Sequence, residues 1–267
     1  MNTLQAIIIA IIEGLTEYLP ISSTAHMGFT ASLMGIPDDE YLKMFQVSIQ
    51  FGAILSIVVL YWRKFFNFTQ WQFYFKLACA VVPALILGKL FDDKIEAVLG
   101  NQKAIAITLI IGGIILLFVD NWFKNPNIHD EKQISVKKAV TIGFWQCLAM
   151  MPGTSRSAAS IIGGMTQGLT RKAAAEFSFF LAIPTMFGAT LLKGYKLYKE
   201  LGLSIFQENW QTLLIGNVVA FFVALLAIRY FIDFVSKYGF RAFGYYRIVL
   251  SVGIALALLF GANISLS

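Results

Sequence analysis

The segment that decides the fold reads EGLTEYLPISSTAH and spans residues 13–26. It interrupts an apolar stretch with two glutamates, a proline, several hydroxyl side chains and a histidine. A second interruption, MPGTSRS at residues 151–157, lies in another apolar stretch about half a chain away. Proline lacks a backbone N–H and stops a helix, so each segment is expected to break the helix around it.

The residues around these two segments are too apolar for a water-soluble domain. The set AVILMFWYC makes up 58% of the 267 residues, and charged residues make up 13%. A soluble domain is about 45–50% apolar and about 25% charged. The net charge is +6, but the 21 basic residues are scattered in short groups between apolar stretches, so nucleic acid is not an expected partner. The composition predicts an integral membrane protein.

Six stretches are long enough to cross a bilayer, which takes about 20 apolar residues. They are residues 43–62, 72–91, 102–119, 174–193, 211–233 and 245–262. Two further regions, 1–35 and 137–170, are apolar but broken, and their arms are short. Irregular backbone at membrane depth is tolerated only where protein or water surrounds it. We therefore expect a re-entrant helical hairpin in each broken region.

The order of elements repeats, because each hairpin is followed by three spans. Two short motifs align between the halves: Pro20-Ile21-Ser22-Ser23 with Pro152-Gly153-Thr154-Ser155 at an offset of 132 residues, and Phe51-Gly52-Ala53 with Phe187-Gly188-Ala189 at 136. Three crossings are an odd number, so the second unit must run through the membrane in the opposite sense.

We therefore predict an all-α polytopic membrane protein with a single integral membrane domain over residues 1–267. It is built as an inverted-topology repeat of two five-helix units, with six full spans and two re-entrant helical hairpins. The first repeat covers residues 1–132 and the second covers residues 133–267.

The distribution of lysine and arginine predicts the orientation. Thirteen basic residues fall in the four stretches 63–76, 120–138, 171–173 and 229–247, seven fall on the opposite side, and Arg156 lies within the membrane. Basic loops favour the cytoplasm. Both termini are then outside, and the first hairpin dips into the membrane from the external face. We expect a site that opens to the external face of the membrane.

Glu13 and Glu17 are functional candidates, because ionisable side chains inside a membrane are costly. Four residues apart, they share one face of a helix, where like charges repel. A divalent cation between them, or a proton on one of them, makes the pair tolerable. Carboxylate oxygens suit Mg²⁺ or Ca²⁺, which favours a metal site. The alternative is an amphipathic surface helix with both acids near water.

Ser22, Ser23, Thr24 and His26 follow the break at Pro20 and could supply a nucleophile and a proton-transfer group. Three hypotheses stay open: Ser23 attacks with His26 as its base, His26 attacks directly, or metal-bound water attacks. We favour the first, because His26 lies one helical turn beyond Ser23, although Ser22, four residues before His26, satisfies the same spacing nearly as well. The alternative without catalysis is a helix-capping cluster with a buried histidine.

The second hairpin has a pattern that favours an anion. Gly153 lets the backbone approach a ligand, and the N–H groups at a helix start attract negative charge. Arg156 adds a planar fork that matches two phosphate oxygens. An ion pair of Arg156 with Glu176 or another acid, holding two helices together, is the structural alternative. The candidate substrate-binding residues are Ser22, Thr24, Gly153, Thr154, Ser155, Ser157 and Ser160.

These two segments resemble the signature segments of the bacterial undecaprenyl-diphosphate phosphatases of the bacitracin-resistance type. The resemblance continues through Gly163-Gly164-Met165, Glu176-Phe177-Ser178-Phe179 and Phe187-Gly188-Ala189-Thr190, and it covers essentially the whole chain. It implies a membrane hydrolase that removes the terminal phosphate of undecaprenyl diphosphate. That reaction recycles the lipid carrier for peptidoglycan synthesis and confers bacitracin resistance. A divalent-cation cofactor, Mg²⁺ or Ca²⁺, is implied as well, and so is a place in the bacterial inner membrane with the external site on the periplasmic side.

The resemblance also implies residue roles. The essential residues of the family correspond to Glu13, Glu17, Ser23, His26 and Arg156, with Ser155 and Ser160 as secondary members. Ala25 and Ala158 stand where glycine is usual, and Ser160 replaces a usual threonine but keeps the hydroxyl. These departures bear on the backbone path of each hairpin tip rather than on the chemistry.

A secondary transporter or a polyprenyl-phosphate flippase is the alternative function, because transporters are built from inverted repeats and broken helices. A carrier could use Glu13 and Glu17 for a cation, but it has little use for a Ser-Ser-Thr-x-His run opposite Arg156. The expected partners are the lipid substrate and membrane lipids. The oligomeric state stays open, with a homodimer as one option.

The predicted orientation can be tested with cysteine substitutions at Lys43 and Lys137. A membrane-impermeant thiol reagent should label the first from outside the cell and the second only from inside. The reverse pattern would overturn both the topology and the external opening of the site.

Overall fold

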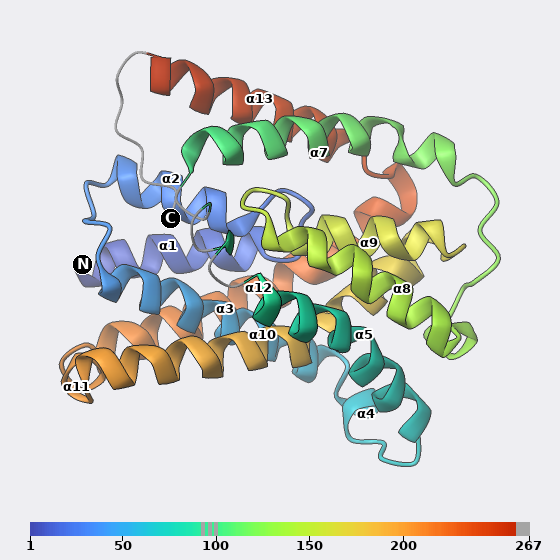
Figure 1. Ribbon diagram of the computed structural model, residues 1–267, viewed down its shortest axis with the longest axis horizontal. Coiled ribbons are helices and arrows are strands. Elements are labelled where there is room, and N and C mark those ends of the chain that lie inside the picture. The colour runs from blue at the N-terminus through green and yellow to red at the C-terminus, as the bar shows by residue number, and fades with distance from the viewer. Residues whose placement is uncertain (92–93, 96–97, 99–100, 260–267) are drawn as a thin grey trace.

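The computed structural model describes residues 1–267 apart from 92–93, 96–97, 99–100 and 260–267, and the described chain is helical without a β-strand (Figure 1). Six of its helices are long and apolar enough to cross a membrane, which makes this a multi-pass membrane protein. They are α3 (Glu40–Leu60), α5 (Trp71–Leu90), α7 (Gln102–Trp122), α10 (Arg171–Leu201), α12 (Trp210–Tyr238) and α13 (Arg241–Leu259). The six predicted spans are confirmed, although residues 260–262 of the last lie outside the described residues.

Two of these helices extend well beyond the predicted spans. The helix α10 has 31 residues and α12 has 29, whereas hydropathy predicted 174–193 and 211–233. Each continues through polar residues until a glycine with positive φ ends it, Gly202 at φ 72° and Gly239 at φ 74°. Hydropathy marks the apolar part of a helix, whereas the helix itself ends where the backbone conformation changes.

The predicted loop over residues 229–247 is wrong. The structure places Arg229 in α12 and Arg247 in α13, and only Gly239 and Phe240 separate the two helices. Arg247 is fully buried, so it cannot count among the loop cations that set the orientation. The polar residues before position 245 lower the local hydropathy without interrupting the helical backbone. Hydropathy therefore places the start of the last span at 245, whereas α13 begins at Arg241.

The two broken regions form the two predicted helical hairpins. The first consists of α1 (Thr3–Thr16) and α2 (Ser23–Leu33), and the second consists of α8 (Val136–Gln146), the 3₁₀ turn η2 (Cys147–Met150) and α9 (Arg156–Thr166). In Figure 1 the first pair lies at the left, the second lies at the right, and their connecting loops meet in the middle. That the two hairpins are re-entrant, and that they enter from opposite membrane faces, stays a prediction. The remaining short helices are α4 (Trp62–Phe65), η1 (Glu131–Gln133) and α11 (Ser204–Glu208).

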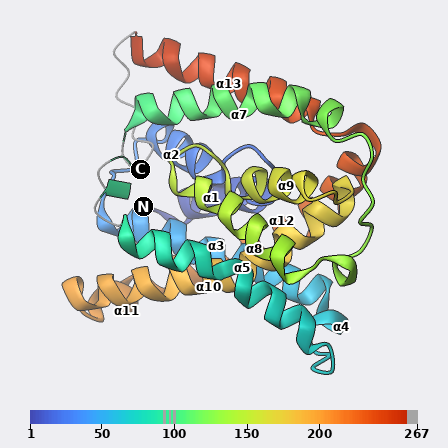
Figure 2. The ribbon, with the colours of Figure 1, turned by 45° about the vertical axis from the view of Figure 1, so that its right-hand side comes forward.

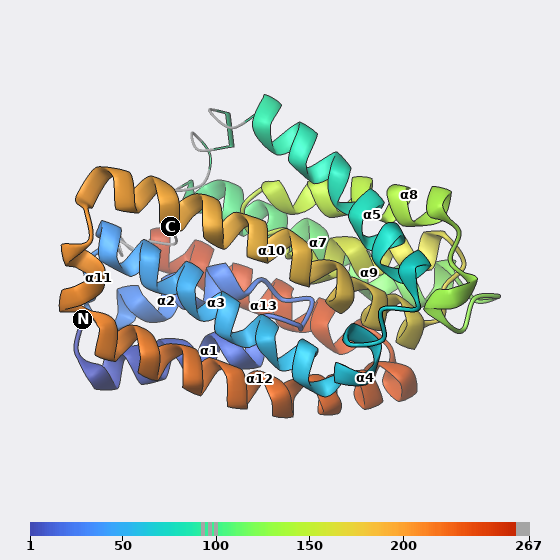
Figure 3. The ribbon, with the colours of Figure 1, turned by 90° about the horizontal axis from the view of Figure 1, so that it is seen from below.

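Helices from the two halves of the chain pack on one another in a reciprocal way. The hairpin helix α1 packs against α12, and the hairpin helix α8 packs against α5 (Figure 3). Both contacts use a glycine, because a Cβ at Gly14 would meet the backbone of Ala220, and one at Gly143 would meet the backbone of Ala80. This exchange of partners is what a two-fold relation between the halves requires. The repeat and its boundary at residue 132 stay predictions.

Two further helix pairs join the two halves of the chain. The helices α7 and α13 lie side by side in Figures 1 and 2, and α3 packs against α10. In the second pair the ring centroids of Phe51 and Phe187 lie 5.9 Å apart. These two residues occupy aligned positions in the predicted repeat, so their mutual contact agrees with the offset of 136 residues.

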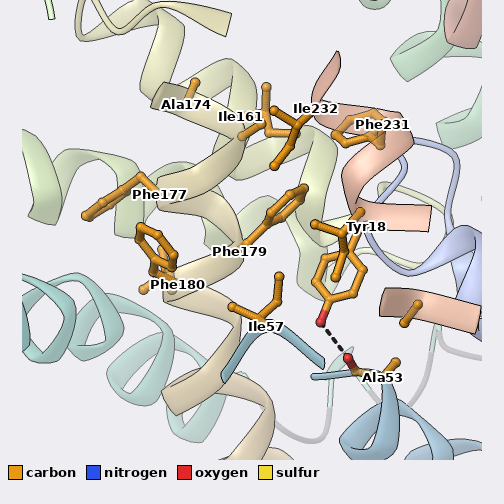
Figure 4. Close-up of a cluster of buried hydrophobic side chains, with 14 of the residues drawn as sticks. Tyr18, Ala53, Ile57, Ile161, Ala174, Phe177, Phe179, Phe180, Phe231 and Ile232 are labelled. Carbon is orange, nitrogen blue, oxygen red and sulfur yellow. Dashed lines mark hydrogen bonds between the residues drawn. The ribbon is translucent and has the colours of Figure 1, made fainter. Parts of the chain in front are cut away.

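A cluster of aromatic side chains anchors the first hairpin tip to the bundle (Figure 4). Tyr18 is fully buried, its hydroxyl donates to the carbonyl oxygen of Ala53 at 2.9 Å, and its ring meets Phe179 edge-on at 4.8 Å. The hydrogen bond satisfies the one polar atom of the side chain, so the rest can pack as an apolar group. Because Tyr18 follows Glu17 directly, this anchor also holds a candidate site residue in place.

Candidate active site

Each hairpin tip ends in a serine with left-handed backbone geometry. Ser22 has φ 71° and Ser155 has φ 70°, and these are the non-glycine residues of positive φ in the described chain. That conformation is strained for residues with a Cβ, and it recurs at functional sites. Both serines directly precede the second helix of their hairpin. The structural counterpart of Ser155 is therefore Ser22, one residue away from the Ser23 that the sequence alignment paired with it.

Glu17 connects the two tips. The hydroxyl of Ser23 donates to its Oε2 at 2.7 Å, and Nη2 of Arg156 donates to its Oε1 at 2.7 Å. The other end of the Arg156 fork, Nη1, donates to the carbonyl oxygen of Ser178 in α10 at 3.0 Å. Arg156 thus pairs with an acid, as the structural alternative required, but that acid is Glu17. Glu176 instead accepts from the hydroxyl of Tyr61 at 3.3 Å.

Glu13 lies one helical turn before Glu17 and is 0% exposed. Within the described residues, neither of its carboxylate oxygens has a hydrogen-bond partner. A buried carboxylate without a donor is costly unless it binds a cation or a proton. The oxygen donors of Glu13 and Glu17 are the kind that Mg²⁺ or Ca²⁺ prefers, so these two residues fit the predicted cation.

A cation at this position would need further ligands from outside the protein. The described residues contain no group of three or more His, Cys, Asp or Glu that could hold a metal ion. Mg²⁺ commonly binds through one or two carboxylates and completes its shell with water and substrate phosphates. A site with two carboxylates is therefore suited to a cation that binds together with a phosphate ligand.

His26 lies close to Ser23 along the helix but bonds elsewhere. Its Nδ1 is 2.8 Å from the carbonyl oxygen of Ser22, and its Nε2 is 2.7 Å from the hydroxyl of Tyr246 in α13. The spacing suggested a hydrogen bond from Ser23 to His26, and the structure does not contain it. Both ring nitrogens have other partners, and Glu17 already accepts from the Ser23 hydroxyl.

The serines of the second tip hold the two hairpins and α10 together. The hydroxyl of Ser157 donates to the carbonyl oxygen of Leu19 in the first tip at 2.9 Å. The hydroxyl of Ser160 donates to the carbonyl oxygen of Arg156 at 2.8 Å and lies 2.6 Å from the hydroxyl of Ser178. These side chains are buried. They position the start of α9, which carries Arg156.

The other predicted substrate-binding residues take different positions. The hydroxyl of Ser155 accepts from the backbone N–H of Ala158 at 3.3 Å and so caps α9. Thr24 is exposed, outside the buried cluster that holds Ser23 and His26. Gly153 and Thr154 direct their carbonyl oxygens towards Arg247. The hydroxyl of Ser22 makes no capping bond.

Arg247 is the residue that the sequence interpretation missed. Its side chain is fully buried and donates five hydrogen bonds to backbone carbonyl oxygens at 2.9–3.2 Å. The acceptors are Pro20 of the first tip, Gly153 and Thr154 of the second, and Thr108 and Leu109 of α7. An arginine inside an apolar stretch is itself a functional signal. Hydropathy does not single out Arg247, because this residue lies at the edge of its predicted span.

The sequence comparisons identify related proteins along nearly the full chain. Residues 6–253 match the family described as bacitracin resistance protein BacA. A protein of Flavobacterium johnsoniae named undecaprenyl-diphosphatase is 54% identical over 94% of each chain. Proteins of the same name from Porphyromonas gingivalis and Bdellovibrio bacteriovorus are 50% and 48% identical, with 99–100% of this chain covered and the whole of each relative.

Removing the Arg247 fork should destabilise the protein. Arg247→Met leaves the tip carbonyl oxygens without donors, at a cost on the order of 1–3 kcal/mol for each oxygen that finds no other partner. The midpoint of thermal unfolding in detergent should therefore fall well below that of the wild type. Arg241→Met is the control, because Arg241 is an exposed arginine of α13 that donates to Leu117 and touches neither tip. Equal midpoints for the two variants would contradict the role of Arg247.

Proposed function

The chain belongs to the bacitracin resistance protein BacA family, and we propose that it hydrolyses undecaprenyl diphosphate to undecaprenyl phosphate and inorganic phosphate. The reaction recycles the lipid carrier of peptidoglycan synthesis and confers resistance to bacitracin. The observation that carries this proposal is the position of Glu17 between the two hairpin tips, with Ser23 on one carboxylate oxygen and Arg156 on the other. This arrangement joins a hydroxyl nucleophile, a base and an anion-binding fork in one buried site.

The geometry supports Ser23 as the attacking group and Glu17 as its base. The Ser23 hydroxyl already donates to Glu17 at 2.7 Å, so its proton can move to that carboxylate as Oγ attacks the terminal phosphorus. The bond from phosphorus to the bridging oxygen breaks, and undecaprenyl phosphate leaves with the proton from Glu17. Water then attacks the phosphoserine, the Oγ–P bond breaks, and a water proton returns to Ser23.

Arg156 is suited to orient both the base and the phosphate. Its Nη2 holds Glu17, its Nη1 holds the Ser178 carbonyl, and its buried Nε has no partner within the described chain. A phosphate oxygen would satisfy that donor. Because the fork is planar and fixed by its two protein partners, the remaining N–H has a defined direction.

Glu13 and Glu17 would hold the divalent cation, Mg²⁺ or Ca²⁺. When bound, it would neutralise negative charge on the phosphate oxygens of the substrate. The partnerless carboxylate of Glu13 supports this assignment.

The proposal also covers the membrane location and the side to which the site opens. A substrate with a long polyprenyl tail reaches a site between membrane helices from within the bilayer. We place the protein in the bacterial inner membrane, with the site open to the external face. The support for this orientation is the excess of basic residues on the other side, which remains twelve against seven once the buried Arg247 is taken out of the thirteen.

The proposal is tested by phosphate release from a polyprenyl diphosphate, with purified protein in detergent. Wild-type protein should release phosphate with Mg²⁺ or Ca²⁺ and lose that activity in a chelator. Ser23→Ala should be inactive, and an acid quench of the wild type should trap phosphoserine, which is acid-stable. Activity in Ser23→Ala would remove Ser23 from the mechanism and leave Ser22, His26 or metal-bound water as the attacking group.

The Arg156 fork should be irreplaceable by lysine. Arg156→Lys keeps the charge but loses the planar fork, whose separate nitrogens reach Glu17 and Ser178 and leave Nε for a phosphate. The loss of one charge-assisted hydrogen bond, about 1.5–3 kcal/mol, should lower kcat/KM by about one to two powers of ten. Activity within twofold of the wild type would reduce Arg156 to a structural ion pair.

A further inference from the structure

The environment of His26 determines which of its nitrogens carries the proton. A carbonyl oxygen can only accept a hydrogen bond, and the Ser22 carbonyl lies 2.8 Å from Nδ1 of His26. In the neutral ring, Nδ1 therefore bears the hydrogen and Nε2 presents a lone pair. That lone pair is the only position from which the neutral His26 can attack phosphorus or accept a proton.

The hydroxyl of Tyr246 occupies this lone pair. It lies 2.7 Å from Nε2, and since Nε2 has no hydrogen the tyrosine must be the donor. The two rings are nearly parallel, with 8° between their planes and 5.5 Å between their centroids. The contact therefore fixes both the direction of the hydrogen bond and the plane of the imidazole ring.

The neighbouring residue fixes the position of Tyr246 relative to the hairpin tips. Its neighbour Arg247 is bonded to the carbonyl oxygens of Pro20, Gly153 and Thr154, so this turn of α13 is tied to both tips. Tyr246 itself is 45% exposed, whereas His26 is 8% exposed. The phenol ring thus lies between the buried histidine and the surroundings of the protein.

We propose that Tyr246 is a positioning residue for the phosphatase reaction, which orients His26 and caps its Nε2 lone pair until a phosphate ligand enters. This proposal rests on the proposed function. A hydroxyl has one hydrogen to donate, so Tyr246 can donate either to His26 or to a phosphate oxygen. When a phosphate takes that hydrogen bond, Nε2 of His26 becomes free to accept another hydrogen bond or a proton.

The test compares Tyr246→Phe with Tyr245→Phe. The first removes the hydroxyl and keeps the ring, and the second makes the same change at a neighbouring exposed tyrosine without a contact to His26 within the described chain. Diethyl pyrocarbonate modifies an imidazole nitrogen that has a free lone pair. The chain has two histidines, so the exposed His129 serves as the internal reference in mass spectrometry.

Tyr246→Phe should raise the modification rate of His26 relative to His129 by about three- to tenfold, the equivalent of one neutral hydrogen bond. It should also lower kcat/KM for phosphate release by about three- to tenfold, and Tyr245→Phe should change neither quantity. Because His129 is exposed in the folded protein, it corrects the ratio for reagent concentration and time, and an unchanged midpoint of thermal unfolding in detergent excludes a general loss of stability as the cause of a raised ratio.

An unchanged labelling ratio in Tyr246→Phe would overturn the contact. A raised ratio with kcat/KM within twofold of the wild type would overturn its role in the reaction, and a lowered kcat/KM with an unchanged ratio would show that the effect does not pass through His26. Wild-type protein without phosphatase activity would contradict the proposed function instead, and the labelling ratio would still report the contact.

Discussion

The carbonyl oxygens at the two hairpin tips impose the constraint on which the structure depends. A helix broken inside a membrane protein leaves backbone acceptors that water cannot reach, and each must find a donor within the protein. Arg247 supplies donors to both tips and to α7 at once. Its charge is buried without a carboxylate partner among the described residues, so backbone dipoles solvate it. Gly112 makes this possible, because a Cβ there would overlap the guanidinium.

With the tips held together, a second polar network can form between them. Glu17 and Ser23 come from the first tip, and Arg156 comes from the second, so the site exists only when both hairpins are in place. The Ser157 hydroxyl bonds to Leu19 and adds a further connection from tip to tip. The unsatisfied carboxylate of Glu13 and the unsatisfied Nε of Arg156 adjoin this network and are of opposite character. The first needs a cation or a proton and the second needs an acceptor, which is compatible with the proposed metal-bound phosphate.

Helix packing fixes the position at which the two tips meet. The hairpin helix α1 lies on α12 and the hairpin helix α8 lies on α5, so each half of the chain supports the hairpin of the other. The two left-handed serines, Ser22 and Ser155, show the same backbone solution at both tips. Strain of this kind persists only where the surrounding contacts over-determine the backbone. Here the surrounding contacts come from α7, α10 and α13.

The amino-acid sequence by itself determined the six spans, the two hairpins and the residues of the two motifs, because these depend on local hydropathy, on proline breaks and on residue type. It could not determine hydrogen-bond partners, because those depend on how the chain folds in space and on where each side chain points. Ser23 bonds to Glu17 rather than to His26, and His26 bonds to Tyr246, which is 220 residues away. Local spacing favoured the nearer histidine, but side-chain direction decided the contact. Arg247 was counted as a loop cation because hydropathy records polarity without recording what surrounds it, and only the packed helices place its guanidinium between the two tips.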